Sequence, residues 1–309
     1  MKNILQKTLG NPIKFAGIGL HSGLRSELTI NPAESNNGII FKRTDLKKNN
    51  IIKANYKNVS SAKLCTTLEN ASGAKVSTVE HLLAALYIAG IDNALIEINS
   101  EEVPIMDGSA KIFLETLHNS QIVTLSAKRK YLKIKNKIEL KDEIRTISIE
   151  PNNESLEVDF QLNYKNKVIG NQRNKVNFQK DELQDVTDSR TFCLFEDIEK
   201  IKKIGLAKGG SLDNAVVVDE NKVLNNGGLR NQKEFVNHKI LDLVGDFLLS
   251  GYRILGNVKC YHGGHELTNL FLREMLDNNK ENFSIFEREN NKVVKKISKE
   301  QYTQIAVNA

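Results

Sequence analysis

One stretch, residues 237–246 with the sequence NHKILDLVGD, constrains the fold of this 309-residue chain more than any other. Apolar residues in and just after it recur at the three-to-four residue spacing of an amphipathic helix; they are Ile240, Leu241, Val244, Phe247 and Leu248. His238 and Asp242 stand four residues apart, so their side chains project from one face, and Asp246 extends that row by one turn. An imidazole nitrogen and a carboxylate oxygen at this separation can bind one divalent cation, and both suit zinc. From this helix alone, a solvent-facing stripe with an internal His–Asp contact is the favoured interpretation.

The composition indicates an ordinary globular protein. Hydrophobic residues make up 40% and charged residues 27% of the chain, and its length allows two domains with separate cores. No run of about 18 apolar residues occurs, which predicts no integral membrane segment, and residues 1–19 lack the apolar core and cleavage site of a signal peptide. Cys65, Cys193 and Cys260 are odd in number and far apart. They argue against a disulfide framework and indicate a reducing cytoplasm.

The charge balance is basic, with a formal net charge of +6 and a sequence pI of about 9.0. Two interpretations compete, namely a basic surface that attracts an anionic partner and a lysine-rich composition with solvated charge. Only 6% of the residues are aromatic, there is no tryptophan, and no basic run is interleaved with stacking residues. We therefore expect no nucleic-acid partner, whereas an anionic small substrate stays open.

Hydrophobic periodicity predicts short strands alternating with helices. The first expected helix is an apolar segment that begins with a Ser77–Glu80 capping box and ends near Gly90. Ser109 is the expected cap of the second helix. The further expected helices cover residues 110–117, 179–186, 196–204, 234–249 and 267–276. The expected strands include residues 93–99, several segments of 131–164, 214–219 and 253–261. The basic stretch 126–137 is the best linker, which predicts domains at 1–127 and 128–309. The polar tail beyond residue 278 is predicted to be a weak strand or disordered.

Polar residues elsewhere in the chain can complete a metal site. His81 follows Glu80 at the start of a predicted helix. A catalytic zinc takes three protein ligands and an open position for water, so His81, His238 and Asp242 form a plausible set that would lower the pKa of that water. Glu80 is then either a general base or merely the second half of the capping box with Ser77.

Three more residues have a chemical and a structural interpretation each. His265 follows two glycines at a predicted strand-to-helix turn, where it could donate a proton, stabilise an oxyanion or bond to the backbone. Thr191 could stabilise an oxyanion or cap a loop, and Lys239 could bind phosphate or lie exposed. His21, in a glycine-rich turn, is interpreted as structural. No HExxH, CxxC, Walker or G-x-S-x-G motif occurs, so the residues by themselves predict a metal hydrolase.

Six further motifs follow one another along the chain. They read STVEHL at 77–82, PIMDGS at 104–109, RTF at 190–192, GGS at 209–211, HKxxDxxGD at 238–246 and GH at 264–265. Together with GIGLH at 17–21, they resemble the UDP-3-O-acyl-N-acetylglucosamine deacetylases, which carry out the committed, zinc-dependent step of lipid A biosynthesis. Because the resemblance is ordered and spans most of the chain, it is far more specific than any single motif.

The resemblance implies an α+β fold of two domains of related build, each a sheet packed against helices, with the active site between them. It implies a bound Zn²⁺ with His81, His238 and Asp242 as ligands. Matching residues by position gives Glu80 as the general base, His265 as the catalytic histidine and Asp246 as the carboxylate that orients it. Thr191 matches the hydroxyl that binds the oxyanion.

The resemblance also implies where the substrate binds. Lys239 matches a residue near the polar head group, and Tyr164 falls where the family has an aromatic residue near the uracil. A hydrophobic acyl passage corresponds roughly to residues 192–217, and its lining candidates are Leu194, Phe195, Ile198, Ile201, Leu206 and Ala207. Phe192 and Gly210, in the same span, are further expected substrate contacts.

We therefore expect a cytoplasmic, monomeric enzyme that hydrolyses the N-acetyl group of UDP-3-O-(3-hydroxyacyl)-N-acetylglucosamine to acetate and the free amine. Its partner is that UDP-linked substrate, with transient contact to the inner-membrane surface. Two alternatives stay open at the level of the sequence. One is a metal-dependent amidase for an unrelated amide, and the other is a basic binding module whose His–Asp pair is structural.

Overall fold

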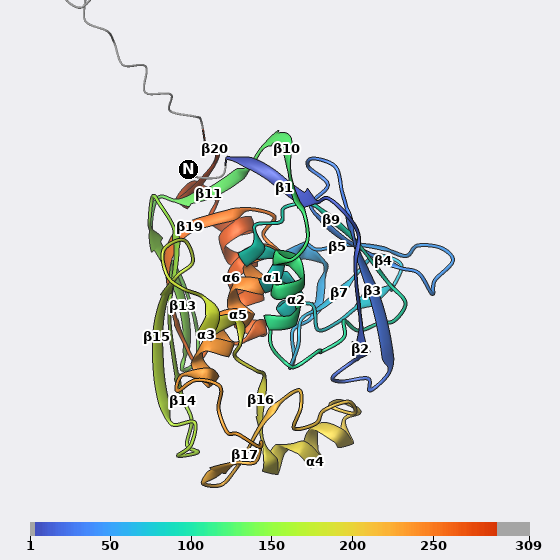
Figure 1. The fold of residues 1–309 in the computed structure, drawn as a ribbon. Coiled ribbons are helices and arrows are strands. Elements are labelled where there is room, and N and C mark those ends of the chain that lie inside the picture. The colour runs from blue at the N-terminus through green and yellow to red at the C-terminus, as the bar shows by residue number, and fades with distance from the viewer. Residues whose placement is uncertain (1–3, 289–309) are drawn as a thin grey trace, which may run out of the picture.

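The computed structural model describes residues 4–288, which form a mixed α and β structure in layers (Figure 1). A sheet from the N-terminal half of the chain and a sheet from the C-terminal half lie on opposite sides, and the long helices lie between them. This arrangement confirms the predicted α+β fold of two similar domains. The boundary predicted between residues 127 and 128 falls at the end of strand β10 (Ile122–Lys128) and stays a prediction.

The N-terminal half is built on a sheet with the strand order β2–β3–β9–β4–β5. Its strands are β2 (Ile13–Ile18), β3 (Arg25–Pro32), β4 (Ile39–Arg43), β5 (Ile51–Lys53) and β9 (Ala94–Ile98). Buried and more exposed residues alternate along β3, β4 and β9, so one face of this sheet packs on the core and the other faces outward. The buried face lies toward α1 (Glu80–Ala89) and α2 (Lys111–His118) (Figure 1).

Smaller elements complete this half. They are β1 (Leu5–Leu9), which pairs with β10, the 3₁₀ turn η1 (Tyr56–Asn58), and the small sheet of β6 (Val59–Ser61), β7 (Thr67–Glu69) and β8 (Lys75–Val76).

The C-terminal half is organised around β19 (Arg253–Tyr261). This strand pairs in parallel with β11 (Lys130–Ile134) and β14 (Leu156–Asn163), and antiparallel with β13 (Arg145–Pro151). The same sheet also contains β12 (Ile138–Asp142), β15 (Asn171–Asn177) and β20 (Phe283–Glu287). Its helical elements are α3 (Gln184–Thr187), α5 (Glu234–Leu248), α6 (His265–Arg273), the π-helical turn η2 (Glu274–Asn278) and the 3₁₀ turn η3 (Lys280–Asn282).

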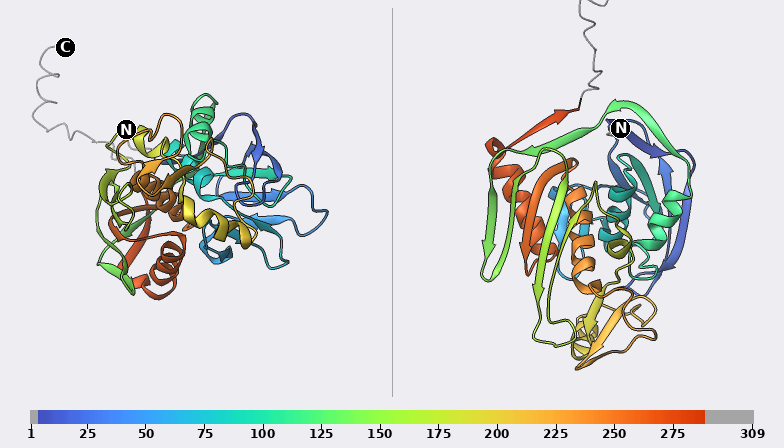
Figure 2. Two further views of the ribbon diagram at one scale, coloured as in Figure 1. Left: turned by 90° about the horizontal axis from the view of Figure 1, so that it is seen from below. Right: turned by 60° about the vertical axis from the view of Figure 1, so that its left-hand side comes forward.

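A small insert projects from the C-terminal half, below the junction of the two halves (Figures 1 and 2). It consists of β16 (Phe192–Leu194), α4 (Phe195–Lys203), β17 (Val216–Asp219) and β18 (Lys222–Val223). None of the residues of α4 is buried, in contrast to α5. The insert is therefore a peripheral unit that packs by its loops and strands.

Most predicted elements are present, with two corrections. The helix predicted at residues 179–186 is reduced to the single turn α3, because Asn177 forms a side-chain turn with the Gln179 amide while the Gln179 side chain accepts from the Leu156 amide. The linker predicted at 126–137 is largely strand, in β10 and β11. Part of the polar tail forms β20, and the remainder lies outside the described residues.

The solvent-facing interpretation of residues 237–246 is wrong. Almost every residue of α5 is buried, including the polar row of His238, Asp242 and Asp246. Buried polar groups need partners, so this row must face other polar groups inside the protein. Within residues 4–288, no helix has both the length and the apolar character needed to cross a membrane.

Candidate metal centre and active site

The site is assembled where α1 and α5, from different halves of the chain, approach each other at Gly245. A Cβ atom on residue 245 would lie 2.1 Å from the carbonyl oxygen of Glu80 and 3.2 Å from the amide nitrogen of Ala84. Only glycine leaves room for this contact between helix backbones. The close approach places the polar row of α5 beside the first turn of α1, which carries Glu80 and His81.

His81, His238 and Asp242 converge in the way that a metal ion requires. One ligand atom from each residue lies within 4.8 Å of the others, and all three residues are buried. Nε2 of His81 is 3.5 Å and Nε2 of His238 is 3.3 Å from Oδ1 of Asp242. Within the described part of the chain, residues 4–288, this buried Oδ1 atom has no hydrogen-bond partner, and neither has Nδ1 of His81. Two imidazoles and a carboxylate with an unpaired oxygen fit the ligand set of a zinc ion.

His238 is held in the form that can bind a metal. Burial lowers the pKa of His238 to about 3, so the ring is neutral at pH 7. Its Nδ1 atom lies 3.1 Å from the carbonyl oxygen of Ser189. Because a carbonyl can only accept a hydrogen bond, Nδ1 carries the hydrogen and Nε2 presents a lone pair toward Asp242.

Asp242 stays ionised although it is buried. Burial works against its charge, but the Lys239 ammonium group and the cationic His265 ring outweigh burial and hold the pKa of Asp242 well below its usual range. Nζ of Lys239 donates to Oδ2 of Asp242 at 2.9 Å. The two oxygens of Asp242 therefore have different partners, with Oδ2 on the lysine and Oδ1 free for a cation.

Glu80 has its carboxylate inside the site, and the capping-box interpretation is wrong. Oε2 of Glu80 accepts a hydrogen bond from the Thr66 amide at 3.1 Å, whereas the Ser77 hydroxyl donates to the carbonyl of Glu101. Burial raises the pKa of Glu80. A buried carboxylate with a raised pKa is a stronger base than an exposed one and is suited to accept a proton.

His265 is the first residue of α6 and faces both Glu80 and Asp246. Its Nδ1 atom is 2.8 Å from Oδ2 of Asp246, and its Nε2 atom is 3.6 Å from Oε1 of Glu80. Burial opposes a charge on this ring, but Asp246 and Glu80 outweigh it and raise the pKa of His265 to about 9. His265 is therefore a cationic proton donor opposite a carboxylate that can act as a base.

The remaining predicted polar contacts lie beside this centre. The amide of Thr191 donates to the carbonyl of Gly108 at 2.8 Å, which ties the first residues of the insert to the N-terminal half. The Phe192 ring stands between the Tyr164 ring, with centroids 5.9 Å apart, and the His238 ring at 6.2 Å. Nζ of Lys239 lies 5.5 Å from the centre of the Phe192 ring.

An apolar pocket of about 340 Å³ opens next to Thr191, between the insert and the N-terminal half. Six of the predicted substrate contacts line it: Phe192, Phe195, Ile198, Ile201, Ala207 and Gly210. Leu194 and Leu206 are not in the lining. The N-terminal half contributes Leu20, His21 and Leu64, which sequence reasoning did not assign to a pocket. The buried His21 ring also accepts a hydrogen bond from the Ala207 amide at 3.4 Å, which helps to seat the insert.

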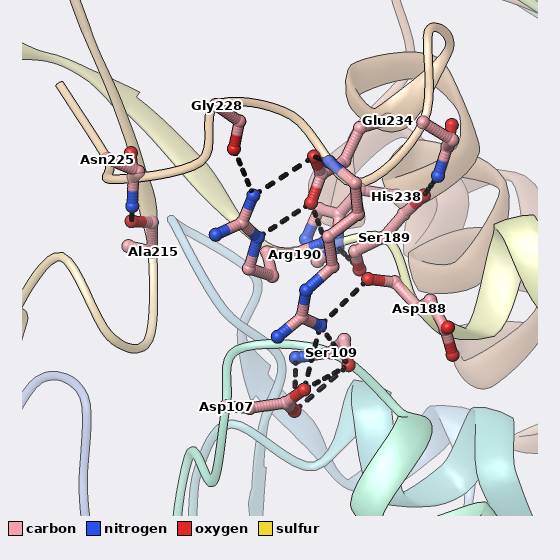
Figure 3. Close-up of polar contacts among 12 residues, drawn as sticks. Asp107, Ser109, Asp188, Ser189, Arg190, Ala215, Asn225, Gly228, Glu234 and His238 are labelled. Carbon is pink, nitrogen blue, oxygen red and sulfur yellow. Dashed lines mark hydrogen bonds and ion pairs between the residues drawn. The ribbon is translucent and has the colours of Figure 1, made fainter. Parts of the chain in front are cut away.

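Two polar residues of the site were missed at the sequence level. Thr66 bonds to both Glu80 and Asp246, and nothing in the sequence near it signals this role. Glu234 forms a buried ion pair with Arg190 at 2.7 Å (Figure 3). The row of positions 234, 238, 242 and 246 on α5 was a signal that could have identified Glu234.

The fold and the site together define an α+β protein with a candidate hydrolytic centre between two similar domains. The candidate centre combines a histidine–histidine–carboxylate cluster with the ligand types of a metal site, a buried histidine–carboxylate pair and a neighbouring apolar pocket.

Comparison with known proteins specifies the family. Residues 6–277 match the sequence model of the family described as "UDP-3-O-acyl N-acetylglycosamine deacetylase". The UDP-3-O-acyl-N-acetylglucosamine deacetylase of Geotalea uraniireducens is 44% identical over 272 residues, which cover 88% of each chain. The enzymes of the same name from Pasteurella multocida and Haemophilus influenzae are 43% and 42% identical over 278 residues, or 89% of this chain and 91% of theirs. The chain belongs to the UDP-3-O-acyl-N-acetylglucosamine deacetylase family.

Proposed function

We propose that His81, His238 and Asp242 bind a zinc ion, at which the N-acetyl group of UDP-3-O-(3-hydroxyacyl)-N-acetylglucosamine is hydrolysed to acetate and the free amine. Deacetylation of this substrate, the committed step of lipid A biosynthesis, is the reaction of the family to which the chain belongs. The observation that carries the metal assignment is the convergence of two buried histidine nitrogens on a buried Asp242 oxygen that has no hydrogen-bond partner among residues 4–288.

Glu80 and His265 divide the proton transfers in this proposal. A bound zinc ion supplies Lewis-acid chemistry, in that it lowers the pKa of water and polarises a carbonyl oxygen. Glu80 accepts the proton of the attacking water, because its Oε2 atom is held by Thr66 while Oε1 faces the site. His265 enters the reaction as a cation and donates a proton to the departing amine, and Asp246 holds its ring in place.

The remaining roles concern the substrate. The Thr191 hydroxyl, at the mouth of the apolar pocket, donates a hydrogen bond to the oxyanion of the tetrahedral intermediate. The 3-O-acyl chain occupies the pocket lined by Phe192, Ile198 and Gly210. Lys239 and Tyr164 bind the polar UDP portion.

We also propose where the enzyme acts. It is a cytoplasmic monomer that makes transient contact with the inner-membrane surface through the apolar rim of the pocket. In support, Phe195 and Leu212, which line the pocket, are 53% and 46% exposed, and Ile204, at the end of α4, is 58% exposed. Exposed apolar side chains that surround a pocket are typical of a surface that meets lipid or another apolar partner.

The test is metal removal and restoration with the acetylated UDP substrate. Acetate release should stop when a chelator removes the metal and return when zinc is added in a one-to-one ratio. Glu80→Gln should bind zinc as the wild type does but release acetate at least about 100-fold more slowly. Full activity in metal-free protein would disprove the proposed mechanism, and tight stoichiometric zinc in His238→Ala would remove His238 from the ligand set.

A further inference from the structure

The peptide group between Ser189 and Arg190 is hydrogen-bonded to α5 at both of its polar atoms (Figure 3). Its carbonyl oxygen accepts from Nδ1 of His238 at 3.1 Å. Its N–H group donates to Oε1 of Glu234, also at 3.1 Å. Glu234 and His238 are four residues apart on α5, so this one peptide group spans a single turn of the helix and connects a carboxylate to an imidazole.

The Glu234 carboxylate is held on all sides. It is fully buried, and Oε1 also accepts from Nε of Arg190 at 2.7 Å. Oε2 accepts from the Arg230 amide at 2.6 Å and from Nη2 of Arg190 at 3.2 Å. Nη2 of Arg190 is fixed in turn by the Gly228 carbonyl at 2.9 Å. A carboxylate with four such donors cannot change its rotamer without leaving charged groups unpaired.

This arrangement matters for His238 in two ways. A carboxylate on the N–H end of a peptide group polarises that group, so its carbonyl oxygen becomes a stronger acceptor for the imidazole N–H. A histidine that binds metal is usually oriented and made more basic by the acceptor on its other nitrogen. The Ser189 carbonyl is that acceptor here, and Glu234 determines both its position and its strength.

We propose that Glu234 is a positioning residue for metal binding, which acts on His238 through the Ser189–Arg190 peptide group. The inference rests on the proposed role of His238 as a metal ligand. The arrangement corresponds to a carboxylate–histidine–metal triad with a peptide group inserted between carboxylate and histidine.

A purely structural role for the Arg190–Glu234 ion pair makes a different prediction. In that case any change to the pair would lower the stability of the fold, and zinc affinity would fall only in proportion to that loss of stability. The loop before α5 makes a second connection, in which Arg230 donates to Asp107 at 2.8 Å and so ties the N-terminal half to this loop. Loss of metal affinity without a matching loss of stability is what separates the two roles.

The experiment is chelator competition for zinc in Glu234→Gln, at a temperature where circular dichroism shows the protein folded. We expect the zinc dissociation constant to rise about 10- to 100-fold, the usual effect of removing a partner of a metal ligand. Arg190→Lys keeps the residue-190 amide on the Glu234 carboxylate, so its dissociation constant should stay within about threefold of the wild type. If Glu234→Gln does not fold, Glu234→Asp takes its place with the same expectation, because the shorter side chain withdraws from the amide.

Asp92→Asn is the matched control. The Asp92 carboxylate likewise accepts from a backbone amide, that of Lys7 at 2.8 Å, and from Arg129 at 2.6 Å, but it lies beyond the far end of α1 from Glu80. We expect Asp92→Asn to lower the melting temperature of the protein and to leave its zinc affinity unchanged. Loss of zinc affinity in Asp92→Asn equal to that in Glu234→Gln would overturn the proposal, and so would a tenfold loss in Arg190→Lys.

A spectroscopic readout tests the peptide connection directly. In zinc-loaded protein with ¹⁵N-labelled histidine, the proton on Nδ1 of His238 should resonate far downfield and move upfield in Glu234→Gln but not in Asp92→Asn. An unchanged resonance together with unchanged zinc affinity would sink the inference while leaving the metal site intact. Absence of stoichiometric zinc from the wild type would instead refute the proposed function.

Discussion

At the scale of single residues, Thr66 shows how few atoms hold the acid and base groups in place. Its amide donates to Glu80 at 3.1 Å, and its hydroxyl donates to Oδ1 of Asp246 at 2.6 Å. Asp246 uses its other oxygen for His265. One buried threonine therefore aligns the proposed base directly and the proposed acid through Asp246.

Thr66→Val should lower kcat and leave KM nearly unchanged. The substitution keeps the shape and the amide but removes a hydroxyl bond to a charged group, which is worth about 1.5–3 kcal/mol, or about 10- to 100-fold in rate if it is lost in the transition state. Steady-state acetate release measures the effect, and Thr66→Ser should restore most of the rate.

Thr8→Val is the control for Thr66→Val. Thr8 is also buried and donates its hydroxyl, to the Asn93 carbonyl at 2.8 Å, but it lies in β1. We expect lower stability and unchanged kcat in that variant. A fall in kcat as large as that of Thr66→Val would show that the effect is general destabilisation.

The charge on His265 gives a prediction for pH in the metal-free protein. Its folded pKa of about 9 exceeds the unfolded value of about 6.5, so its contribution to stability is complete below about pH 6.5 and is lost as the pH rises through 9. The contribution is at most about 3 kcal/mol. In Asp246→Asn the pKa of His265 should be lower, as NMR titration would detect. The free energy of unfolding, measured in urea, should change less between about pH 6.5 and pH 9 than it does in the wild type. An unchanged pKa would contradict the assignment.

At the scale of elements, the contact between α1 and α5 decides whether the two parts of the proposed metal site meet. α1 contributes Glu80 and His81, and α5 contributes His238 and Asp242. At Gly245 the backbones of the two helices come so close that a Cβ atom would lie 2.1 Å from the carbonyl oxygen of Glu80. The missing side chain at residue 245 therefore allows the spacing at which the two helices pack.

Gly245→Ala should separate α1 from α5 and damage stability and metal binding together. The added methyl group would lie 2.1 Å from a backbone oxygen, which cannot rotate away as a side chain could. Overpacking of this kind costs about 1–3 kcal/mol, which exceeds the gain of up to about 1 kcal/mol in helix propensity. Thermal unfolding and zinc titration check this, and a melting temperature at or above that of the wild type would refute it.

At the scale of the whole molecule, the proposed ion is a cross-link between the two halves of the chain. His81 comes from the N-terminal half and the other two ligands from the C-terminal half. A ligand that binds only the folded state stabilises it by RT ln(1 + [L]/Kd), or about 4 kcal/mol at a thousandfold excess over Kd. The free energy of zinc binding therefore stabilises the structure in which the two halves are joined, and not either half alone.

Zinc should accordingly raise the melting temperature of the chelator-treated protein by several degrees, in a concentration-dependent way. His81→Ala and His238→Ala should abolish this rise, although one residue lies in each half. Calorimetry with and without zinc is the measurement. A zinc-dependent rise that persists in either variant would place the ion elsewhere.

Much of the fold could be predicted from the sequence where local pattern and tertiary packing agree. The helix predicted at 234–249 is α5, and the strand predicted at 253–261 is β19. The predictions failed where a polar side chain had a distant partner. Glu80 has the spacing of a capping box with Ser77, but its carboxylate accepts a hydrogen bond from the amide of Thr66 instead. The Gln179 side chain accepts a hydrogen bond from the amide of Leu156, and residue 179 is not part of a helix.

The residue types of the centre and the helix that aligns His238 with Asp242 follow from the amino-acid sequence, because a period of 3.6 residues is a local property. Its motifs also indicated the family to which the chain belongs. The burial of α5 and the contacts that Thr66 and Glu234 make with the site depend on the tertiary fold. Thr66 and the Ser189–Arg190 peptide group reach α5 from separate segments of the chain, and the spacing of residues along α5 does not specify which segment packs against it.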